Sequence, residues 1–225
     1  MRPVICMITK GVQSDQEEAV LIDRITAAAR AGVHLIQIRQ SHMEGRALVR
    51  LAGRAVAATR GTDARILIND RVDVALAVGA HGVHLKEASI AARRVRTVAP
   101  AGFVIGRSVH SPEEGARVAS EGGLDFLMLG AVFETTSKPT VRPAGLTALA
   151  AACAAVTLPV LGVGGMMPRR LRDVASTGCA GFAAIELFAA TAVERLPVIV
   201  EEATSAFDTR RPNALGPEVQ QWPRR

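Results

Sequence analysis

Polar and ionisable residues follow five successive strand-like runs of the chain, at the position where each run ends. They are Gln37 and Arg39, then Asn69, Asp70 and Arg71, then Lys86 and Glu87, then Ser108 and His110, and finally the segment 130–138. An exposed loop or a helix cap would explain any one of these residues. Five consecutive strand ends with such groups favour instead one shared site that combines imidazole, carboxylate, amide and ammonium groups.

His110 is a candidate for proton transfer. Ser111 and Glu114 follow it with the spacing of a helix capping box, so the histidine would stand at the mouth of the site. An imidazole there can accept and release protons near neutral pH, although a hydrogen bond to loop backbone explains it equally well. Glu134 in the next loop would be a second acid or base, or the cap of a turn. We take His110 and Glu134 as the catalytic candidates.

Two glycines after the seventh strand-like run indicate a bound phosphate. Gly164 and Gly165 stand just before the expected seventh helix. Glycine lets backbone N–H groups approach an anion closely, and in eight-stranded α/β barrels the loops after strands 7 and 8 commonly hold phosphate. We expect the phosphate at Gly164, Gly165, Ala184 and Ile185. A tight strand-to-helix turn is the simpler explanation, and the two are compatible.

Other polar groups are candidates for binding the rest of a substrate. These residues are Gln37, Arg39, Asn69, Ser108, Thr135 and Lys138. Lys138 belongs to a hydroxyl-rich loop that would act as a lid, and its ammonium group would pair with a phosphate or a carboxylate. A solvated lysine is the alternative. His84 lies inside a strand-like run and is expected in the core, whereas His34 and His81 precede their strands and are expected at the opposite end.

Eight strand-like runs alternate with amphipathic helices along the chain. The expected strands are residues 4–8, 34–38, 66–68, 82–85, 104–108, 126–129, 160–163 and 181–185. Nearly continuous apolar strands, separated by helices with three- and four-residue apolar spacing, predict parallel strands joined by helical crossovers. Eight such units favour an α/β fold, a single-domain (β/α)8 TIM barrel over residues 1–207. Residues 208–225 lose this periodicity and are expected to form a mobile basic tail.

The composition of the 225-residue chain narrows its class. Apolar residues make up 49% and charged residues 21%, which is typical of a globular protein and excludes disordered, collagen-like and coiled-coil proteins. No segment has the length of an apolar membrane span, and the N-terminus does not resemble a signal peptide. The three widely spaced cysteines fit reduced structural thiols better than a disulfide or zinc framework. We therefore expect a cytoplasmic protein without a membrane partner.

The net charge of +6 does not indicate a nucleic-acid partner. Four arginines and two acidic residues place +2 of it in residues 208–225, and the rest is spread along the chain. Aromatic residues are only 3%, which leaves few platforms for stacking on bases, and no nucleic-acid-binding motif is present. A small phosphorylated ligand explains the basic charge better. A monomer and a homo-oligomer are both compatible with the sequence.

Six ordered motifs resemble those of the thiamine phosphate synthase/TenI superfamily. They are the segments 37–39, 67–73, 82–85, 106–111, 130–135 together with Lys138, and 162–166. The likeness extends over residues 4–206. It implies the barrel fold, a role in thiamine biosynthesis and a small phosphorylated thiazole as substrate.

The synthase of this superfamily joins a pyrimidine diphosphate to thiazole phosphate with Mg²⁺. The resemblance places its metal ligands at aspartates after strands 3 and 4, and a lysine shortly after the strand 2 arginine. Asp70 matches the first aspartate, with Asn69 and Arg71 as its expected hydrogen-bonding neighbours. Residues 86–89 read Lys-Glu-Ala-Ser where the synthase has Gly-Gln-x-Asp, and residues 40–42 read Gln-Ser-His where it has the lysine. One carboxylate supports a magnesium ion poorly, and whether Glu87 replaces the lost aspartate stays open.

Other motifs are closer to those of TenI, the thiazole tautomerase. They are the segments 106–111, 132–135, 164–166 and 171–174. The resemblance implies an isomerase that aromatises a carboxythiazole phosphate by proton transfer, with a histidine at the place of His110 and no cofactor. We therefore predict a thiazole tautomerase. The alternatives are thiamine phosphate synthase with Mg²⁺ at Asp70, and a non-catalytic regulatory protein that binds thiazole phosphate.

Overall fold

The computed structural model describes residues 2–135 and 142–208, in which eight parallel strands form a closed barrel. The strands are β1 Val4–Ile8, β2 Leu35–Ile38, β3 Arg65–Asn69, β4 Gly82–Leu85, β5 Val104–Val109, β6 Phe126–Gly130, β7 Val160–Val163 and β8 Gly181–Ala184. Strands that are neighbours in sequence are neighbours in the barrel, and β8 closes against β1. Each strand overlaps the one expected from the sequence, so the (β/α)8 barrel is confirmed.

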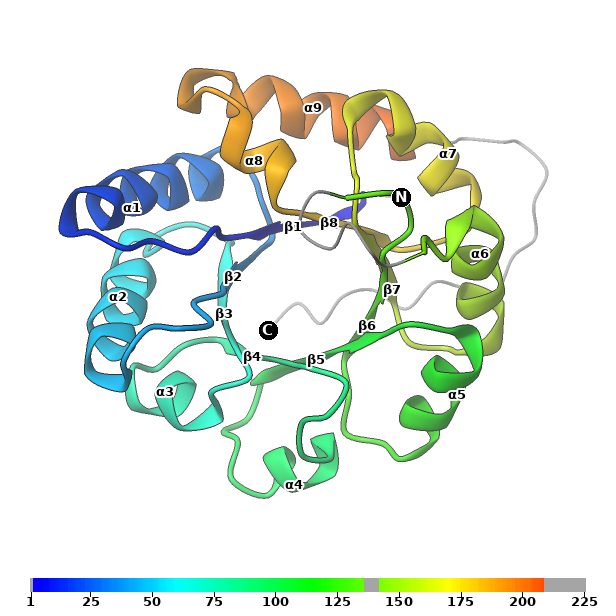
Figure 1. The fold of residues 1–225 in the computed structure, drawn as a ribbon, viewed down its shortest axis with the longest axis horizontal. Helices are drawn as coiled ribbons and strands as arrows, with labels where there is room; N and C mark the ends of the chain where they lie inside the picture. The colour runs from blue at the N-terminus through cyan, green and yellow to red at the C-terminus, as the bar shows by residue number, and fades with distance from the viewer. Residues whose placement is uncertain (1, 136–141, 209–225) are drawn as a thin grey trace.

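Helices follow the strands and enclose the barrel (Figure 1). The α-helices are α1 Asp15–Arg30, α2 Gly45–Ala58, α3 Val72–Ala77, α4 Ala92–Arg96, α5 Pro112–Ser120, α6 Gly145–Ala155, α7 Leu171–Ser176, α8 Glu186–Ala190 and α9 Leu196–Phe207. The short 3₁₀ helices η1 Pro168–Arg170 and η2 Val193–Arg195 precede α7 and α9. Within the described ranges, no helix is both long and apolar enough to cross a membrane. The predicted tail lies outside the described residues, apart from Asp208.

Side chains alternate along each strand between the barrel interior and the surrounding helices. On β2, Ile36 and Ile38 pack against the helices, whereas Leu35 packs inside the barrel. The interior cluster includes Cys6, Leu35, Leu67, Phe126, Met128 and Leu161. Gly106 makes room for the Phe126 ring, because a Cβ at position 106 would lie 2.1 Å from it. The barrel is therefore filled with side chains, and the ends of the strands are the place for a ligand.

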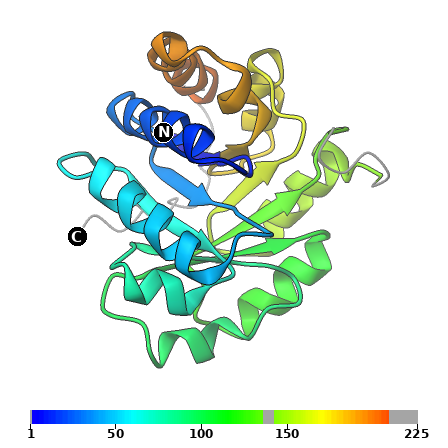
Figure 2. The same ribbon diagram turned by 60° about the vertical axis from the view of Figure 1, so that its left-hand side comes forward.

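Helices α1 and α2 lie side by side on the barrel (Figure 2), and a buried carboxylate joins them. Glu18 on α1 accepts hydrogen bonds from Arg54 at 2.6 Å and from Arg50 at 3.3 Å, both on α2. A buried charge is stable only when it is paired. This cluster therefore fixes the two helices that connect β1, β2 and β3, three strands of the barrel.

His34 and His81 lie at the amino-terminal ends of strands, as the sequence predicts. Nδ1 of His34 accepts the backbone N–H of Ile5 at 3.2 Å, and Nδ1 of His81 accepts that of Ile66 at 3.0 Å. Burial lowers the pKa of both histidines. Both rings therefore pair with strand backbone at the end of the barrel opposite to the predicted site.

The three cysteines are free thiols. Burial raises the pKa of Cys6 to about 12 and that of Cys153 also to about 12, and it raises the pKa of Cys179 as well. A nucleophilic cysteine needs a thiolate near neutral pH. The thiols are therefore structural, as the sequence predicts.

Candidate active site

A layer of polar side chains lies inside the barrel at the carboxyl ends of β2 to β5. Gln37 Nε2 donates to Asn69 Oδ1 at 2.7 Å, and His84 Nε2 lies 2.9 Å from Ser108 Oγ. Sequence analysis predicted three of these residues for the site and placed His84 in the core. Within the described residues, Gln37 Oε1 and His84 Nδ1 are buried without a hydrogen-bond partner. Buried polar atoms are normally paired, so we expect a ligand or a water molecule here.

His84 is a neutral imidazole in the folded protein. Its side chain is buried, and burial lowers its pKa from 6.5 to about 4, because the charged ring would lose its hydration. The neighbouring charges of Asp70 and Arg107 act in opposite directions on this pKa. The hydrogen bond with Ser108 therefore involves a neutral ring.

We expect the free energy of unfolding to fall as the pH decreases from 7 to 5. Native His84 stays neutral down to about pH 4, whereas the unfolded residue takes up a proton near its usual pKa of 6.5, so stability is lost as the pH falls through this window. One such histidine contributes a loss of roughly 2 kcal/mol. Urea unfolding at both pH values measures this decrease in the free energy of unfolding. In His84→Gln the decrease should be smaller than in wild type by that amount. The exposed His42→Gln variant is the control, and an equal loss in His84→Gln and wild type would contradict the prediction.

The ring of His110 is oriented by the carbonyl group of Gly130. His110 directly follows β5 and is exposed, and its Nδ1 lies 2.7 Å from Gly130 O. A carbonyl oxygen only accepts hydrogen bonds, so Nδ1 carries a proton and the neutral ring keeps its lone pair on Nε2. Nε2 lies 3.6 Å from Glu87 Oε2. In its neutral form His110 therefore has the lone pair of Nε2 at the mouth of the barrel, beside a carboxylate.

The helix cap after His110 differs in one bond from the predicted capping box. The Ser111 hydroxyl accepts the N–H of Glu114 at 3.2 Å, as predicted. The Glu114 carboxylate, however, accepts the backbone N–H of His110 at 2.7 Å rather than that of Ser111. The N-terminus of α5 therefore holds the backbone of His110, while Gly130 holds its ring.

Asp70 follows β3 in a left-handed conformation, with φ of 63°, and residues after β4 hold its carboxylate. Lys86 Nζ lies 2.9 Å from Oδ2, and the Ser89 hydroxyl donates to Oδ1. Burial raises the pKa of Asp70, but the hydrogen bonds from Ser89 and Lys86 and the charge of Lys86 outweigh burial, so its pKa lies below the usual value. Asp70 is therefore a paired carboxylate.

The hydrogen-bonding neighbours predicted for Asp70 were wrong. Asn69 bonds to Gln37 instead, and Arg71 forms a two-point ion pair with Asp73 at 2.8 and 2.6 Å. The left-handed backbone of Asp70 turns its side chain toward the loop after β4, away from its neighbours in sequence. The carboxylate therefore joins two loops.

Arg107 anchors the loop after β4 and was missed by sequence analysis. Its buried guanidinium donates to the carbonyl oxygens of Glu87 at 3.0 Å, Ser89 at 2.6 Å and Ile90 at 3.1 Å. A charged residue within an apolar strand is rarely buried unless it is paired. An arginine inside this apolar strand could therefore have indicated a buried, paired guanidinium. The partners come from the preceding loop, so spacing along the sequence does not reveal them.

The residues after β3 and β4 do not fit a magnesium ion. Mg²⁺ needs oxygen ligands in nearly octahedral positions, and both oxygens of Asp70 are already engaged. Ser89 stands where a second aspartate would be needed, and Glu87 faces His110 instead. In residues 2–135 and 142–208, no three His, Cys, Asp or Glu side chains come together as a metal site.

Gly164 and Gly165 form the turn after β7, with φ of 99° and 64°. A Cβ at Gly164 would lie 2.7 Å from Ala131 Cβ, and one at Gly165 would lie 2.4 Å from Glu134 O. These glycines therefore let the loop after β6 pack against the turn. In the described part of the chain, their N–H groups and that of Ile185 after β8 make no hydrogen bond. They remain available to an anion.

The other predicted residues lie around this mouth or outside the described ranges. Arg39 and Glu134 are exposed, Thr135 is partly buried, and Ala184 ends β8. Among the described residues, no hydrogen bond or ion pair joins Glu134 to His110. Lys138, the predicted lid cation, lies outside the described residues.

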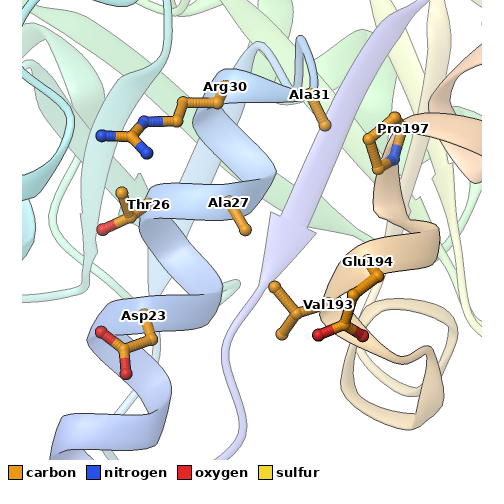
Figure 3. A pocket seen from close by; sticks show the side chains of 8 residues that line it. All are labelled: Asp23, Thr26, Ala27, Arg30, Ala31, Val193, Glu194 and Pro197. Carbon is orange, nitrogen blue, oxygen red and sulfur yellow. The ribbon is translucent and has the colours of Figure 1, made fainter.

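A cavity of about 530 Å³ lies on the outer surface of the barrel (Figure 3). Its walls are Asp23, Thr26, Ala27, Arg30 and Ala31 on one side and Val193, Glu194 and Pro197 on the other. None of the predicted site residues lines it. Because barrels of this type place their chemistry at the carboxyl ends of the strands, the polar layer is the stronger candidate for the active site.

Comparisons with known proteins agree with the fold. Residues 5–188 match the family model described as thiamine monophosphate synthase. A putative thiamine-phosphate synthase 2 from Aquifex aeolicus is 36% identical over 167 residues, which cover 74% of this chain and 89% of the relative. A thiamine-phosphate synthase from Roseiflexus castenholzii is 38% identical over 169 residues, covering 75% and 74%. The solved thiamine phosphate pyrophosphorylase from Pyrococcus furiosus superposes with a TM-score of 0.73 at 32% identity, covering 88% and 96%.

Proposed function

Because the chain belongs to the thiamine monophosphate synthase family, we propose that it acts in thiamine biosynthesis as a thiazole tautomerase. The substrate is a carboxythiazole phosphate, and the reaction aromatises its ring by moving a proton. The orientation of the His110 ring carries this proposal. The lack of a fitting magnesium site at Asp70 supports it, because proton transfer between carbon atoms needs no metal ion.

His110 is the base of the proposed reaction. Gly130 O holds the proton on Nδ1, so Nε2 accepts a proton from one carbon of the substrate and returns it to another. One C–H bond breaks and another forms, so atoms and electrons balance. The carboxylate of Glu87, 3.6 Å from Nε2, stabilises the imidazolium in between. Glu134 is the second candidate for returning the proton, from the loop after β6.

Substrate groups are assigned to two parts of the site. The polar layer with Gln37, Asn69 and Ser108 would bind the heterocycle, because two of its buried polar atoms lack partners in the described residues. The free N–H groups of Gly164, Gly165 and Ile185 would hold the phosphate together with the end of β8 at Ala184, as anions bind at such strand-to-helix turns. Arg39 and Thr135 would complete the mouth.

A second candidate function is thiamine phosphate synthase, and the names of the relatives favour it. The relatives from Aquifex aeolicus, Roseiflexus castenholzii and Pyrococcus furiosus are named as synthases or as a pyrophosphorylase. That reaction would need Mg²⁺ at Asp70. The engaged carboxylate of Asp70 and the serine at position 89 argue against it.

We expect turnover of carboxythiazole phosphate to persist in excess EDTA. Proton transfer spreads its charge over a conjugated ring and needs only nearby donors and cations, whereas departure of diphosphate requires a metal ion. Ultraviolet absorbance of the aromatic product measures isomerisation with and without chelator. A parallel assay measures diphosphate release from a pyrimidine diphosphate and thiazole phosphate with Mg²⁺.

The same assays distinguish the two candidates through a pair of aspartate variants. Asp70→Asn should retain most of the isomerisation, and Asp73→Asn, which removes the nearby carboxylate paired with Arg71, is its control. Formation of thiamine phosphate that depends on Mg²⁺ and is lost only in Asp70→Asn would establish the synthase instead.

We also infer a cytoplasmic location. The three cysteines are free, which suits a reducing compartment.

A further inference from the structure

We propose that the ammonium group of Lys86 takes the place of a divalent cation at Asp70, so that the wild-type chain carries a tethered cation and binds no metal ion there. The pair joins the loops after β3 and β4, with 2.9 Å between Nζ and Oδ2. This proposal goes beyond the proposed reaction, because it concerns which cation neutralises the carboxylate of Asp70. Its test measures metal binding, so it stands or falls separately from turnover.

Both carboxylate oxygens of Asp70, the first ligands that a metal ion would need there, already have a partner. Ser89 donates to Oδ1 of Asp70, and Lys86 is paired with Oδ2. The backbone N–H of Lys86 donates to the Ser89 hydroxyl at 2.8 Å, which fixes that hydroxyl in place. Three carbonyl oxygens of the loop, those of Glu87, Ser89 and Ile90, accept hydrogen bonds from Arg107. A divalent cation would have to displace these donors to obtain its ligands.

Fixed positive charges also oppose a metal ion at this edge. Lys86 is paired with the carboxylate itself, and the guanidinium of Arg107 lies beneath the same loop. Like charges repel, so both groups disfavour a further cation at Asp70. An ammonium group neutralises one carboxylate but has no open coordination positions. Lys86 therefore supplies the charge of a cation without the ability to bridge two oxygens of a diphosphate.

The test is binding of Mn²⁺, followed by the loss of the electron paramagnetic resonance signal of the free ion. Wild type should bind Mn²⁺ weakly at most. The double variant Lys86→Gln, Ser89→Asp frees Asp70 and adds a second carboxylate, so it should bind at least about tenfold more tightly. Mg²⁺ should compete for the same site.

Matched variants locate the gained site. Lys10→Gln removes the lysine of another ion pair at 2.9 Å, with Glu186, and should bind Mn²⁺ like wild type. Adding Asp70→Asn to the double variant should remove the gain, and circular dichroism confirms that each variant is folded. Tight Mn²⁺ binding by wild type that Asp70→Asn abolishes would overturn the proposal. Equal affinities of wild type and the folded double variant would overturn it as well.

Discussion

His110→Ala should lower the turnover of carboxythiazole phosphate by a factor on the order of 10² to 10⁴, the usual contribution of a positioned general base. In the neutral ring the lone pair lies on Nε2, because Gly130 O accepts the proton of Nδ1, and alanine removes that base. The Michaelis constant should change little, since the polar layer and the glycine turn remain. Steady-state kinetics with the aromatic product as readout measures both quantities.

Two further variants make this expectation specific. His42→Ala removes an exposed histidine from the loop after β2 and should leave turnover unchanged. Glu87→Gln keeps the size of the side chain 3.6 Å from Nε2 but removes its charge, and should lower turnover less than His110→Ala. If His110→Ala turns over like wild type, the proton is moved by Glu134 or by a water molecule.

Gly165→Val should weaken binding of thiazole phosphate by roughly 10- to 100-fold, because one lost hydrogen bond to a charged group costs about 1.5–3 kcal/mol. The N–H of Gly165 is one of the donors assigned to the phosphate. Valine does not tolerate the φ of 64° found there. Its Cβ would also press on Glu134 O, 2.4 Å away. Isothermal titration calorimetry with thiazole phosphate measures the affinity.

A second glycine variant distinguishes the effect of conformational strain from the loss of the phosphate site. Gly178 has φ of 81°, but a Cβ there would meet nothing within 4 Å. Gly178→Val should therefore lose stability yet keep its affinity for thiazole phosphate. Wild-type affinity in Gly165→Val would place the phosphate elsewhere, and an equal loss of affinity in both variants would mean that strain, not the site, weakens binding.

The positions of the strands could be predicted because a parallel strand covered on both faces is a nearly continuous apolar run. The same pattern predicted which polar residues lie together, since residues at the ends of these runs meet at one end of the barrel. Gln37, Asn69 and Ser108 were predicted in this way. The geometry shows that Gly164 and Gly165 allow the loop after β6 to pack closely against the turn after β7, whereas their role in phosphate binding stays a prediction.

The partners of these residues could not be predicted, because they depend on contacts between loops. Asp70, which follows β3, pairs with Lys86, which follows β4, although residues next to Asp70 in sequence were expected as its hydrogen-bond partners. Glu87, considered as a replacement metal ligand, faces His110. A side chain's direction depends on backbone conformation, such as the left-handed Asp70, and the order of residues alone does not determine it.

Arg107 holds the loop after β4 through its backbone, so the conformation of the loop does not depend on the side chains that the loop carries. In the described part of the chain, the guanidinium of Arg107 donates hydrogen bonds to three backbone carbonyl oxygens of that loop, and every amino acid has such an oxygen. Substitutions at Lys86, Glu87 or Ser89 therefore leave the hydrogen bonds of Arg107 intact. They can nevertheless add or remove a positive charge, a negative charge or a metal ligand at the mouth of the barrel. A few point mutations on one scaffold would thus suffice for evolution to gain or lose dependence on a metal ion.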